Sequence, residues 1–424
     1  MKPWLLLATF WLAILPAGPA LAQIYDTNNI EVHTFAGYGF AGYVDGQGLY
    51  SAFSAPSQIA ADAAGNLYVL DNGNARIRKV TPNGTVSTLV GGGLNYEGFG
   101  TNVSLAWGAL GSMTADRTGN LWLVLAPNSY SGNTAFLISI TTNGYVTLQT
   151  AGLTNLTVTS GLGFDSANNL YYSGGNRIYR YTPTTGQLQP FAGNGLPGNF
   201  DGQGTVFDEF NTPTALACDP ANNLYVWDSG NATIRRVDQN QNVTTLAGNS
   251  ANYYYGNQDG SGTNATFSGV NSLFTDTSGN LYLVSNSSIR KMDAQTNVDT
   301  LAGNFNQYSG GFADGPGSQA KFNNALGGCL VQGTLYIADA GNNRIRSLTM
   351  NAPAQNVAPA SLQLNTYPGL LITGTPGRTY QIQTSPDLKA WTTSATLVLP
   401  SSPYFWVDQN PVAGSKYYRA VMLP

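Results

Sequence analysis

Five aspartates recur at one place in a repeated pattern, and they are the first residues whose type and spacing could support chemistry. Each follows a short apolar run and precedes a turn that ends in Gly-Asn or Asn-Asn: Asp62, Asp116, Asp165, Asp219 and Asp276. A ring of carboxylates could ligate a cation. However, an aspartate that begins such a turn accepts hydrogen bonds from the turn N–H groups, and Leu330 replaces it in a sixth copy. The pattern therefore favours a structural role over a metal site.

A second set of residues combines aspartates with arginines. Asp71, Asp228 and Asp339 end the next apolar run of their copies, and each is followed by a basic pair: Arg76 and Arg78, Arg235 and Arg236, Arg344 and Arg346. Together they could form an anion site. In a hairpin the two runs are neighbours, and residues i and i+2 project from one face of a strand, so cross-strand ion pairing explains these residues more simply.

Asp-Gly connections between copies resemble calcium loops only faintly. They begin at Asp45, Asp201, Asp259 and Asp314. A calcium loop needs side-chain oxygens at several alternating positions and a terminal glutamate, which none of these segments has. Their glycines are explained by turns that need positive φ, and we expect the phenylalanines that follow, Phe53, Phe210, Phe267 and Phe322, to pack between neighbouring sheets.

The two cysteines and the composition restrict the remaining chemistry. Cys218 and Cys329 both stand six residues before a repeated leucine, so the sequence predicts equivalent positions, too far apart for a disulfide, and two buried free thiols. One His in 424 residues excludes most zinc sites. No GxSxG, HExxH or GxxxxGKS motif occurs. The net charge of −4, with dispersed cations, indicates neither a nucleic-acid partner nor an anionic membrane.

The elements that must position these residues form a repeat. The pattern apolar-Asp-x-x-Gly-Asn-Leu-Tyr-Val places its leucine at positions 67, 121, 170, 224, 281 and 335, a spacing of about 54 residues. Each unit resolves into four short apolar runs separated by turns, which predicts a four-stranded antiparallel meander. Because a meander has two apolar faces, the units must stack.

Radial stacking of such meanders gives an all-β fold, a six-bladed β-propeller. The sixth unit stops after RIRSLTM and lacks a fourth strand, whereas the run that begins at Asn29, NIEVHTFAGYG, matches the fourth strands NVTTLAGNS and NVDTLAGN. We therefore expect the N-terminal strand to complete the last blade and so remove an unpaired edge.

The units resemble the NHL repeat, whose pattern is close to GNLYVADxxNxRIRK, a VxTLAG strand and a DGxGxxAxF connection. The first unit, GNLYVLDNGNARIRKVTPNGTVSTLVG, matches almost completely, and the resemblance spans residues 29 to 350. It implies the propeller fold, with roles that range from interaction domains to enzymes. Related lyases use several histidines around a metal, but this chain has only His33. Related gluconolactonases use Glu, Asn and Asp around calcium, but only Glu97 and Glu209 follow Glu31.

Two further segments flank the expected propeller, residues 23–350. Residues 1–22 combine Lys2, an apolar run and the small-x-small site Ala20-Leu21-Ala22, which predicts a cleavable signal peptide and a secreted or periplasmic protein. After a linker at 351–360, residues 361–424 contain GRTYQIQTSPDLKAWTT and SKYYRAVML, typical of a small Ig- or fibronectin-like β-sandwich. They resemble a C-terminal module of exported bacterial proteins, in which Tyr380 and Trp391 are expected in the core.

The connections from the fourth strand of one unit to the first strand of the next are rich in Tyr, Phe, Asn and Gly. By strand parity they all emerge on one face, and this mixture is typical of binding loops. The alternative is that the aromatic side chains plug gaps between blades. The candidate binding residues are Tyr38, Phe40, Tyr96, Phe99, Tyr253, Tyr254, Tyr255, Tyr308 and Phe312.

The sequence therefore predicts a secreted, monomeric, non-catalytic binding or scaffolding protein whose partner is a protein or a carbohydrate, with no nucleic acid and no membrane insertion. It predicts no catalytic residue, no metal-ligating residue and no cofactor, and it leaves open a structural calcium ion held by carbonyl groups in the channel. The alternative is a calcium-dependent hydrolase, lactonase or lyase of the propeller type.

Overall fold

A computed structural model describes residues 30–423 except 96, 107, 128–134, 152, 154, 158, 250–255, 304–309, 351–361, 366–368, 401–403 and 408–416. The expected signal peptide, residues 1–22, and the expected linker, 351–360, lie outside the described residues. The chain divides into two compact units, Met1–Asn351 and Ala352–Pro424, and each is described by itself.

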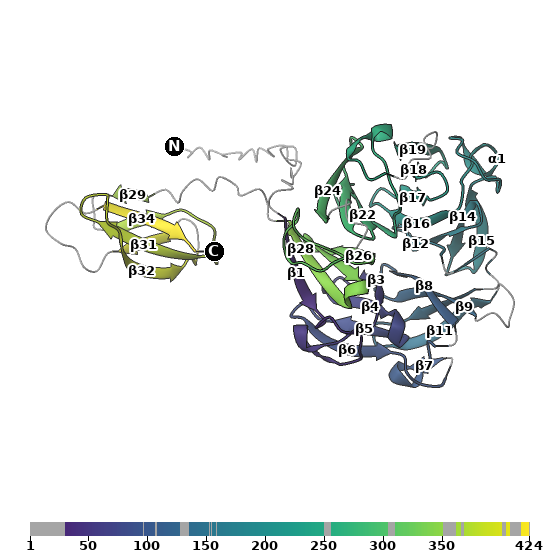
Figure 1. The fold of residues 1–424 in the computed structure, drawn as a ribbon, viewed down its shortest axis with the longest axis horizontal. Coiled ribbons are helices and arrows are strands. Elements are labelled where there is room, and N and C mark those ends of the chain that lie inside the picture. The colour runs from purple at the N-terminus through teal and green to yellow at the C-terminus, as the bar shows by residue number, and fades with distance from the viewer. Residues whose placement is uncertain are drawn as a thin grey trace, which may run out of the picture. The chain divides into compact units, whose positions relative to one another are not determined.

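The described part of the first unit forms six antiparallel sheets, which we number by the chain order of their innermost strands (Figure 1). Sheet 1 contains β3 (Pro56–Ala61), β4 (Leu67–Asp71), β5 (Arg76–Val80) and β6 (Thr85–Val90). Sheet 2 contains β8 (Gly108–Ala115), β9 (Leu121–Pro127), β10 (Phe136–Ile140) and β11 (Tyr145–Ala151). Sheet 3 contains β12 (Leu162–Phe164), β13 (Leu170–Gly174), β14 (Arg177–Thr182) and β15 (Gln187–Ala192).

The other three sheets repeat this order. Sheet 4 contains β16 (Pro213–Cys218), β17 (Leu224–Asp228), β18 (Thr233–Val237) and β19 (Val243–Gly248). Sheet 5 contains β21 (Ser272–Thr275), β22 (Leu281–Ser285), β23 (Ser288–Met292) and β24 (Asn297–Gly303). Sheet 6 contains β26 (Ala325–Val331), β27 (Thr334–Asp339), β28 (Arg344–Met350) and the N-terminal strand β1 (Ile30–Ala36).

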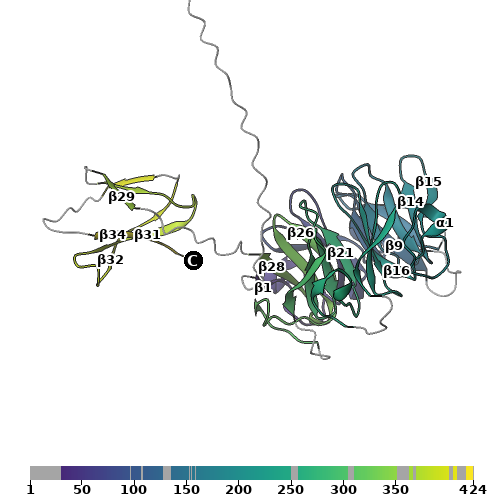
Figure 2. The same cartoon turned by 90° about the horizontal axis from the view of Figure 1, so that it is seen from above.

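The sheets are arranged in a ring with their first strands innermost (Figure 1). Figure 2 shows the same sheets after a turn of 90°. Neighbouring first strands contact one another in the order β3, β8, β12, β16, β21, β26 and back to β3. The buried apolar side chains of the described residues form one cluster between each pair of neighbouring sheets. Tyr68 of sheet 1 and Leu123 of sheet 2, for example, share a cluster. Each meander thus buries both faces against its neighbours, as the repeat requires.

The N-terminal strand closes the ring. β1 pairs antiparallel with β28, with Ile30 opposite Met350 and Val32 opposite Leu348. Both Ile30 and Val32 are fully buried in the cluster that joins sheets 5 and 6. The predicted pairing of the N-terminal strand with the sixth unit is confirmed.

Four sheets gain a short fifth strand at their outer edge, which the sequence did not predict. These edge strands are β2 (Gly46–Gln47) on sheet 1, β7 (Gly98–Phe99) on sheet 2, β20 (Gly260–Ser261) on sheet 5 and β25 (Gly315–Pro316) on sheet 6. Each belongs to a connection between consecutive sheets. A two-residue strand has no hydrophobic alternation, so the sequence carries no signal for it. The α-helix described in this unit, α1 (Gly204–Phe207), lies in the corresponding connection before sheet 4.

The second unit contains two three-stranded sheets in its described residues. One has the order β29 (Leu362–Asn365), β30 (Gly369–Ile372), β33 (Tyr404–Val407), and the other β32 (Thr392–Val398), β31 (Thr379–Ser385), β34 (Tyr417–Met422). Tyr380 is buried in their shared core, as expected, and its hydroxyl accepts a hydrogen bond from the Thr375 N–H at 2.8 Å. Trp391 is not in that core: it is half-buried, 4.4 Å from the Arg419 guanidinium that stacks on it.

Candidate functional site

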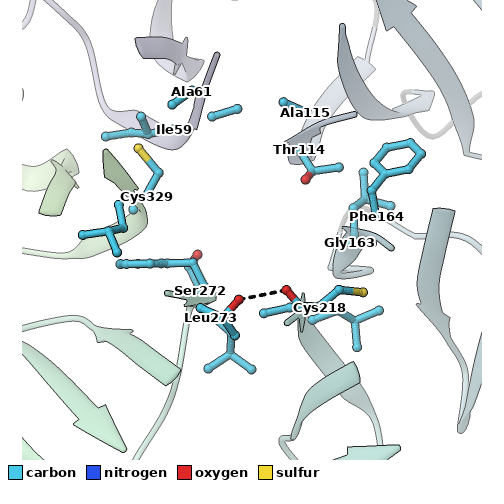
Figure 3. Close-up of a pocket in the computed structure, with 18 of the residues that line it drawn as sticks. Ile59, Ala61, Thr114, Ala115, Gly163, Phe164, Cys218, Ser272, Leu273 and Cys329 are labelled. Atoms are coloured by element: carbon cyan, nitrogen blue, oxygen red, sulfur yellow. Dashed lines mark hydrogen bonds between the residues drawn. The ribbon is translucent and has the colours of Figure 1, made fainter. Parts of the chain in front are cut away.

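A channel lies at the centre of the ring of sheets. This cavity of about 620 Å³ is lined by residues of all six inner strands. Its wall combines small and apolar side chains such as Ala61, Ala115 and Leu273 with the hydroxyl groups of Thr114 and Ser272 (Figure 3). A cavity of this size is typical of small-molecule sites. The channel is therefore one candidate site.

The repeated aspartates hold the hairpins between first and second strands, at one end of the channel. Asp62 Oδ1 accepts from the Asn66 N–H at 2.9 Å, and Oδ2 accepts from the Asn66 side chain at 2.8 Å and the Tyr68 hydroxyl at 3.0 Å. Burial favours the neutral acid, but these hydrogen bonds together outweigh it and lower the pKa of Asp62. Equivalent contacts recur at Asp116, Asp165, Asp219 and Asp276. The predicted structural role is confirmed.

The sixth hairpin differs from the others and corrects the predicted register of the cysteines. It has two residues, Gln332 and Gly333, both with positive φ (48° and 83°), which a tight two-residue turn requires. Cys329 consequently pairs with Tyr336, whereas Cys218 pairs with Leu224, the first residue of its second strand. The two cysteines therefore occupy positions that differ by one residue along their first strands. Both stand six residues before the repeated leucine, but the hairpin between them and that leucine is shorter in sheet 6 than in sheet 4. Both are free thiols, as predicted, but they are half-buried on the wall of the central channel rather than fully buried.

Each fully buried arginine of sheets 1, 4 and 6 lies between two aspartates. Arg78 Nη1 donates to Asp71 Oδ2 at 2.9 Å, and Arg78 Nη2 donates to Asp45 Oδ1 at 2.6 Å. The same triad joins Arg235 to Asp228 and Asp201, and Arg346 to Asp339 and Asp314. In sheet 5, Arg290 pairs with Asp259, and Ser285 stands in place of the second aspartate. The predicted ion pairs are confirmed for Arg78, Arg235 and Arg346, and they also explain the Asp-Gly connections. Arg76 and Arg344 stack on aromatic rings instead, and among the described residues Arg236 forms no ion pair.

Buried phenylalanines complete these clusters. Phe53, Phe210, Phe267 and Phe322 are almost inaccessible to solvent, and their ring centroids lie 4.9–5.2 Å from the guanidinium groups of their own sheets. They pack as the sequence predicted. The Asp-Gly connections therefore end in structural anchors rather than in an open ligand site.

The second candidate site is the face from which the connections between consecutive sheets emerge, which we call the loop face. The connections span residues 37–55, 91–107, 152–161, 193–212, 249–271 and 304–324. Every exposed large apolar side chain described in residues 30–350 lies in them, except Tyr145 and Leu148 on β11. Five of these side chains lie in or beside the outer-edge elements β2, β7 and α1, namely Leu49, Tyr50, Phe99, Val206 and Phe207. The others belong to the loop tips, where exposed apolar side chains can mark an interaction surface.

The structure places four of the nine predicted binding residues. Tyr38 and Phe40 lie together at one loop tip, with ring centroids 5.6 Å apart, and Phe40 is 72% exposed. Phe312 packs under the Arg344 guanidinium at 3.9 Å. Phe99 lies in the edge strand β7 against Tyr145, so it belongs to the outer edge of sheet 2 rather than to a loop tip. Tyr96, Tyr253, Tyr254, Tyr255 and Tyr308 lie outside the described residues.

Other loop-face residues were missed by the sequence prediction. Leu94 and Leu196 are 93% and 63% exposed at tips corresponding to that of Phe40. Tyr43, two residues before Asp45, stacks on Arg76 at 4.0 Å, just as Phe312, two residues before Asp314, stacks on Arg344. The shared distance from the Asp-Gly pair was the signal that could have identified Tyr43.

The residue types that a metal-dependent propeller enzyme would use are few in this chain. In the described residues, no group of three or more His, Cys, Asp or Glu residues is placed to hold a metal ion. His33 is exposed on β1, and Glu97 Oε1 accepts from the Leu148 N–H at 2.8 Å. In the same residues, no helix has the length and hydrophobicity that crossing a bilayer requires.

Comparison with known proteins agrees with the ring of sheets. The structure is similar to a protein of unknown function from Bacteroides thetaiotaomicron, with a TM-score of 0.58 and 19% identity over 76% of each chain. It is also similar to an auxiliary nutrient binding protein from Bacteroides ovatus, with a TM-score of 0.58 and 19% identity over 76% of this chain and 77% of that one. The fold is β-propeller-like. At these identities the likeness concerns the fold alone.

Sequence comparison adds one distant relative of this β-propeller-like chain. Protein SUPPRESSOR OF QUENCHING 1, a chloroplastic protein of Arabidopsis thaliana, is 25% identical over 332 residues, which cover 74% of this chain and 26% of that protein. The chain thus spans about a quarter of the length of that relative. No protein-family model matches the chain.

Proposed function

We propose that this chain is an exported, non-catalytic binding or scaffolding protein that recognises a protein or a glycan through its loop face. The proposed architecture is a signal peptide at 1–22, a six-bladed NHL-like propeller and a C-terminal β-sandwich module. The observation that carries the proposal is that, in the described part of residues 30–350, all but two of the exposed large apolar side chains lie in the connections between sheets. A similar fold in an auxiliary nutrient binding protein supports a ligand-binding role.

Two arrangements make the loop face suited to binding. Arg76 and Arg344 stack on Tyr43 and Phe312, which limits the motion of these aromatic rings and so lowers the entropy lost on binding. Phe40, Leu94 and Leu196 stand at separate loop tips with little protein cover. Such side chains contribute much to affinity and little to the folded core.

The test uses the full chain on a glycan array and a peptide array. Once a bound probe is found, Phe40→Ala combined with Leu196→Ala should weaken its binding about thirtyfold, the equivalent of a hot-spot loss of about 2 kcal/mol, without a change in melting temperature. Tyr145→Ala combined with Leu148→Ala removes the two exposed large apolar side chains described on β11, at the outer edge of sheet 2, and serves as the control. Binding that is lost only in the control variant would refute the loop-face proposal.

Metal analysis of the purified protein distinguishes the enzymatic alternative from the proposed binding protein. A calcium-dependent hydrolase or lyase requires a bound metal, whereas the proposed binding protein requires none, and a purely structural calcium in the channel would leave binding intact after chelation. Calcium at one ion per chain, together with turnover of a lactone that chelation abolishes, would favour the enzyme.

A further inference from the structure

Arg117 is the one positively charged side chain on the channel wall among the described residues. It lies in the hairpin between β8 and β9, at the end of the channel opposite the loop face, and it is exposed. In the described part of the chain its N–H donates to Asn168 Oδ1 at 2.9 Å and its Nε donates to the Asp165 carbonyl oxygen at 3.3 Å. Both terminal nitrogens of the guanidinium have no protein partner there.

The neighbouring hairpin holds Arg117 in place. Asn168 adopts a left-handed conformation (φ 61°), at a position where glycine stands in sheets 1, 2 and 5. Asparagine tolerates this conformation, and its side chain adds a contact that glycine cannot make. Asn222 makes the corresponding bond to the Ser166 N–H at 2.8 Å. The hairpins of sheets 2, 3 and 4 are thereby tied together, and the arginine is positioned in advance of any ligand.

Five carboxylates lie in the hairpins at the same end of the channel, and each is engaged by its own hairpin: Asp62, Asp116, Asp165, Asp219 and Asp276. Asp116 accepts hydrogen bonds from Thr118, Asn120 and Trp122. Because its own hairpin holds each carboxylate, none of the five forms an ion pair with Arg117 in the described structure. The two terminal nitrogens of Arg117 are therefore the groups that can pair with an anion.

The wall beyond Arg117 offers uncharged polar groups. Thr114 and Ser272 lie on the channel wall (Figure 3), and Gln58 lines it as well. In the described structure these three side chains form no hydrogen bond to the protein. They alternate with small residues such as Ala115 and Gly163, which leave room for a ligand. Such a wall suits hydroxyl groups better than an extended apolar chain.

We propose that the channel binds a small hydroxylated carboxylate. Its carboxylate lies on the two terminal nitrogens of Arg117, a bidentate pairing that matches the guanidinium geometry. Its hydroxyl groups exchange hydrogen bonds with Thr114 and Ser272. This site is separate from the loop face, so either one can fail without the other.

The experiment is calorimetric titration of the full chain with galacturonate, with galactose as the neutral match and acetate as a carboxylate without hydroxyl groups. Galacturonate should bind, and both galactose and acetate should bind at least about tenfold more weakly. Arg117→Gln should lose about tenfold in galacturonate affinity, and Thr114→Val a smaller factor. Arg378→Gln, an exposed arginine of the second unit, and Phe40→Ala are controls that should bind as the parent does.

Three outcomes would overturn the proposal. The parent protein does not bind galacturonate at millimolar concentration, or Arg117→Gln binds it with unchanged affinity, or acetate binds as tightly as galacturonate. The third result would leave an anion site without the hydroxyl-binding wall. Because Arg117 is exposed and its backbone makes the bond to Asn168, the variant should keep the melting temperature of the parent, which shows that it is folded.

Discussion

Leu125 and Ile138 of sheet 2 occupy the positions that the ion pair of Asp71 and Arg78 occupies in sheet 1. Asp71 and Arg78 lie on adjacent strands with both side chains fully buried and 2.9 Å between Oδ2 and Nη1. Leu125 and Ile138 share an apolar cluster at the same register. The same fold therefore accepts either a buried ion pair or two aliphatic side chains at this place.

The first prediction exploits this natural replacement. Asp71→Leu should destabilise the protein by about 3–5 kcal/mol, because it leaves the buried Arg78 with only the partly exposed Asp45 as an acidic partner. Adding Arg78→Ile should recover part of that loss, since no buried charge is left unpaired. Recovery will be incomplete because Asp71 also accepts from the Ser54 N–H and from Asn74. Denaturant titrations of the single and double variants measure the coupling.

A matched cycle in sheet 2 serves as control. Leu125→Asp and Ile138→Arg should each destabilise the protein, and the pair should be less harmful than the sum of the two. If Asp71→Leu with Arg78→Ile is no more stable than Asp71→Leu alone, the burial of an unpaired charge is not the reason for the loss.

The second prediction concerns pH. Burial raises the pKa of Asp228 to about 6 and outweighs the opposing hydrogen bonds and the charge of Arg235. Since an unfolded aspartate has a pKa of about 3.9, the folded state binds more protons than the unfolded state between these values. The contribution of this group to stability is therefore greatest below about pH 4 and is lost as the pH rises through 6. The free energy of unfolding of the parent minus that of Asp228→Asn should be about 1 kcal/mol larger at pH 5 than at pH 7.

The measurement is a pair of denaturant titrations at each pH. Asp201→Asn, on the exposed side of the same triad, is measured alongside as the matched variant. A parent-minus-variant difference that shrinks at pH 5 would mean that Arg235 holds the Asp228 carboxylate charged in the folded protein.

Most of the repeat could be predicted from the sequence, because one leucine recurs in every unit at a nearly constant spacing. The repeated leucines at 67, 121, 170, 224 and 281 are each the first residue of a second strand. All the described side chains of these five strands are buried, so most positions require apolar residues. The repeat is therefore easy to recognise in the sequence. In the sixth unit the second strand, β27, begins at Thr334, one residue before the repeated leucine at 335. The reason is that a two-residue turn replaces the aspartate hairpin of the other units.

The loop face could be predicted only in outline. Aromatic composition indicated the right segments, but the positions of Tyr43 and Phe312 depend on arginines that are near them only after folding. Phe99 was assigned to the loop tips because nothing in its sequence distinguishes a two-residue edge strand from a loop. The contacts of Arg117 could not be predicted from the sequence either. Its partners Asp165 and Asn168 lie in the next sheet, about 50 residues away in the chain, and are near it only after folding.

The third prediction is that both thiols are free and that the folded protein suppresses their reactivity. Desolvation raises the pKa of Cys329 to about 12, and it also raises the pKa of Cys218. Because the thiolate is the reactive form, alkylation near pH 8 should be more than about a hundredfold slower in the folded than in the unfolded protein. Unfolded protein without reductant should titrate with two thiols, and a titre of zero would show a disulfide.

The last prediction concerns closure of the ring. Removing residues 23–37 deletes β1, which pairs with β28 and buries Ile30 and Val32 between sheets 5 and 6. The deletion exposes the outer edge of β28 and opens the cluster that joins sheets 5 and 6, so the melting temperature should fall steeply and the chain should aggregate through the free edge. Removing residues 361–424 instead takes away most of a separate compact unit and should change the melting of the ring far less. Calorimetry of the two truncated chains makes the comparison directly.

If the N-terminal deletion melts within about two degrees of the parent, β1 does not stabilise the closed ring. In that case the pairing of β1 with β28 would be dispensable, and closure of the ring would depend on the contacts of β26 and β27 with β3.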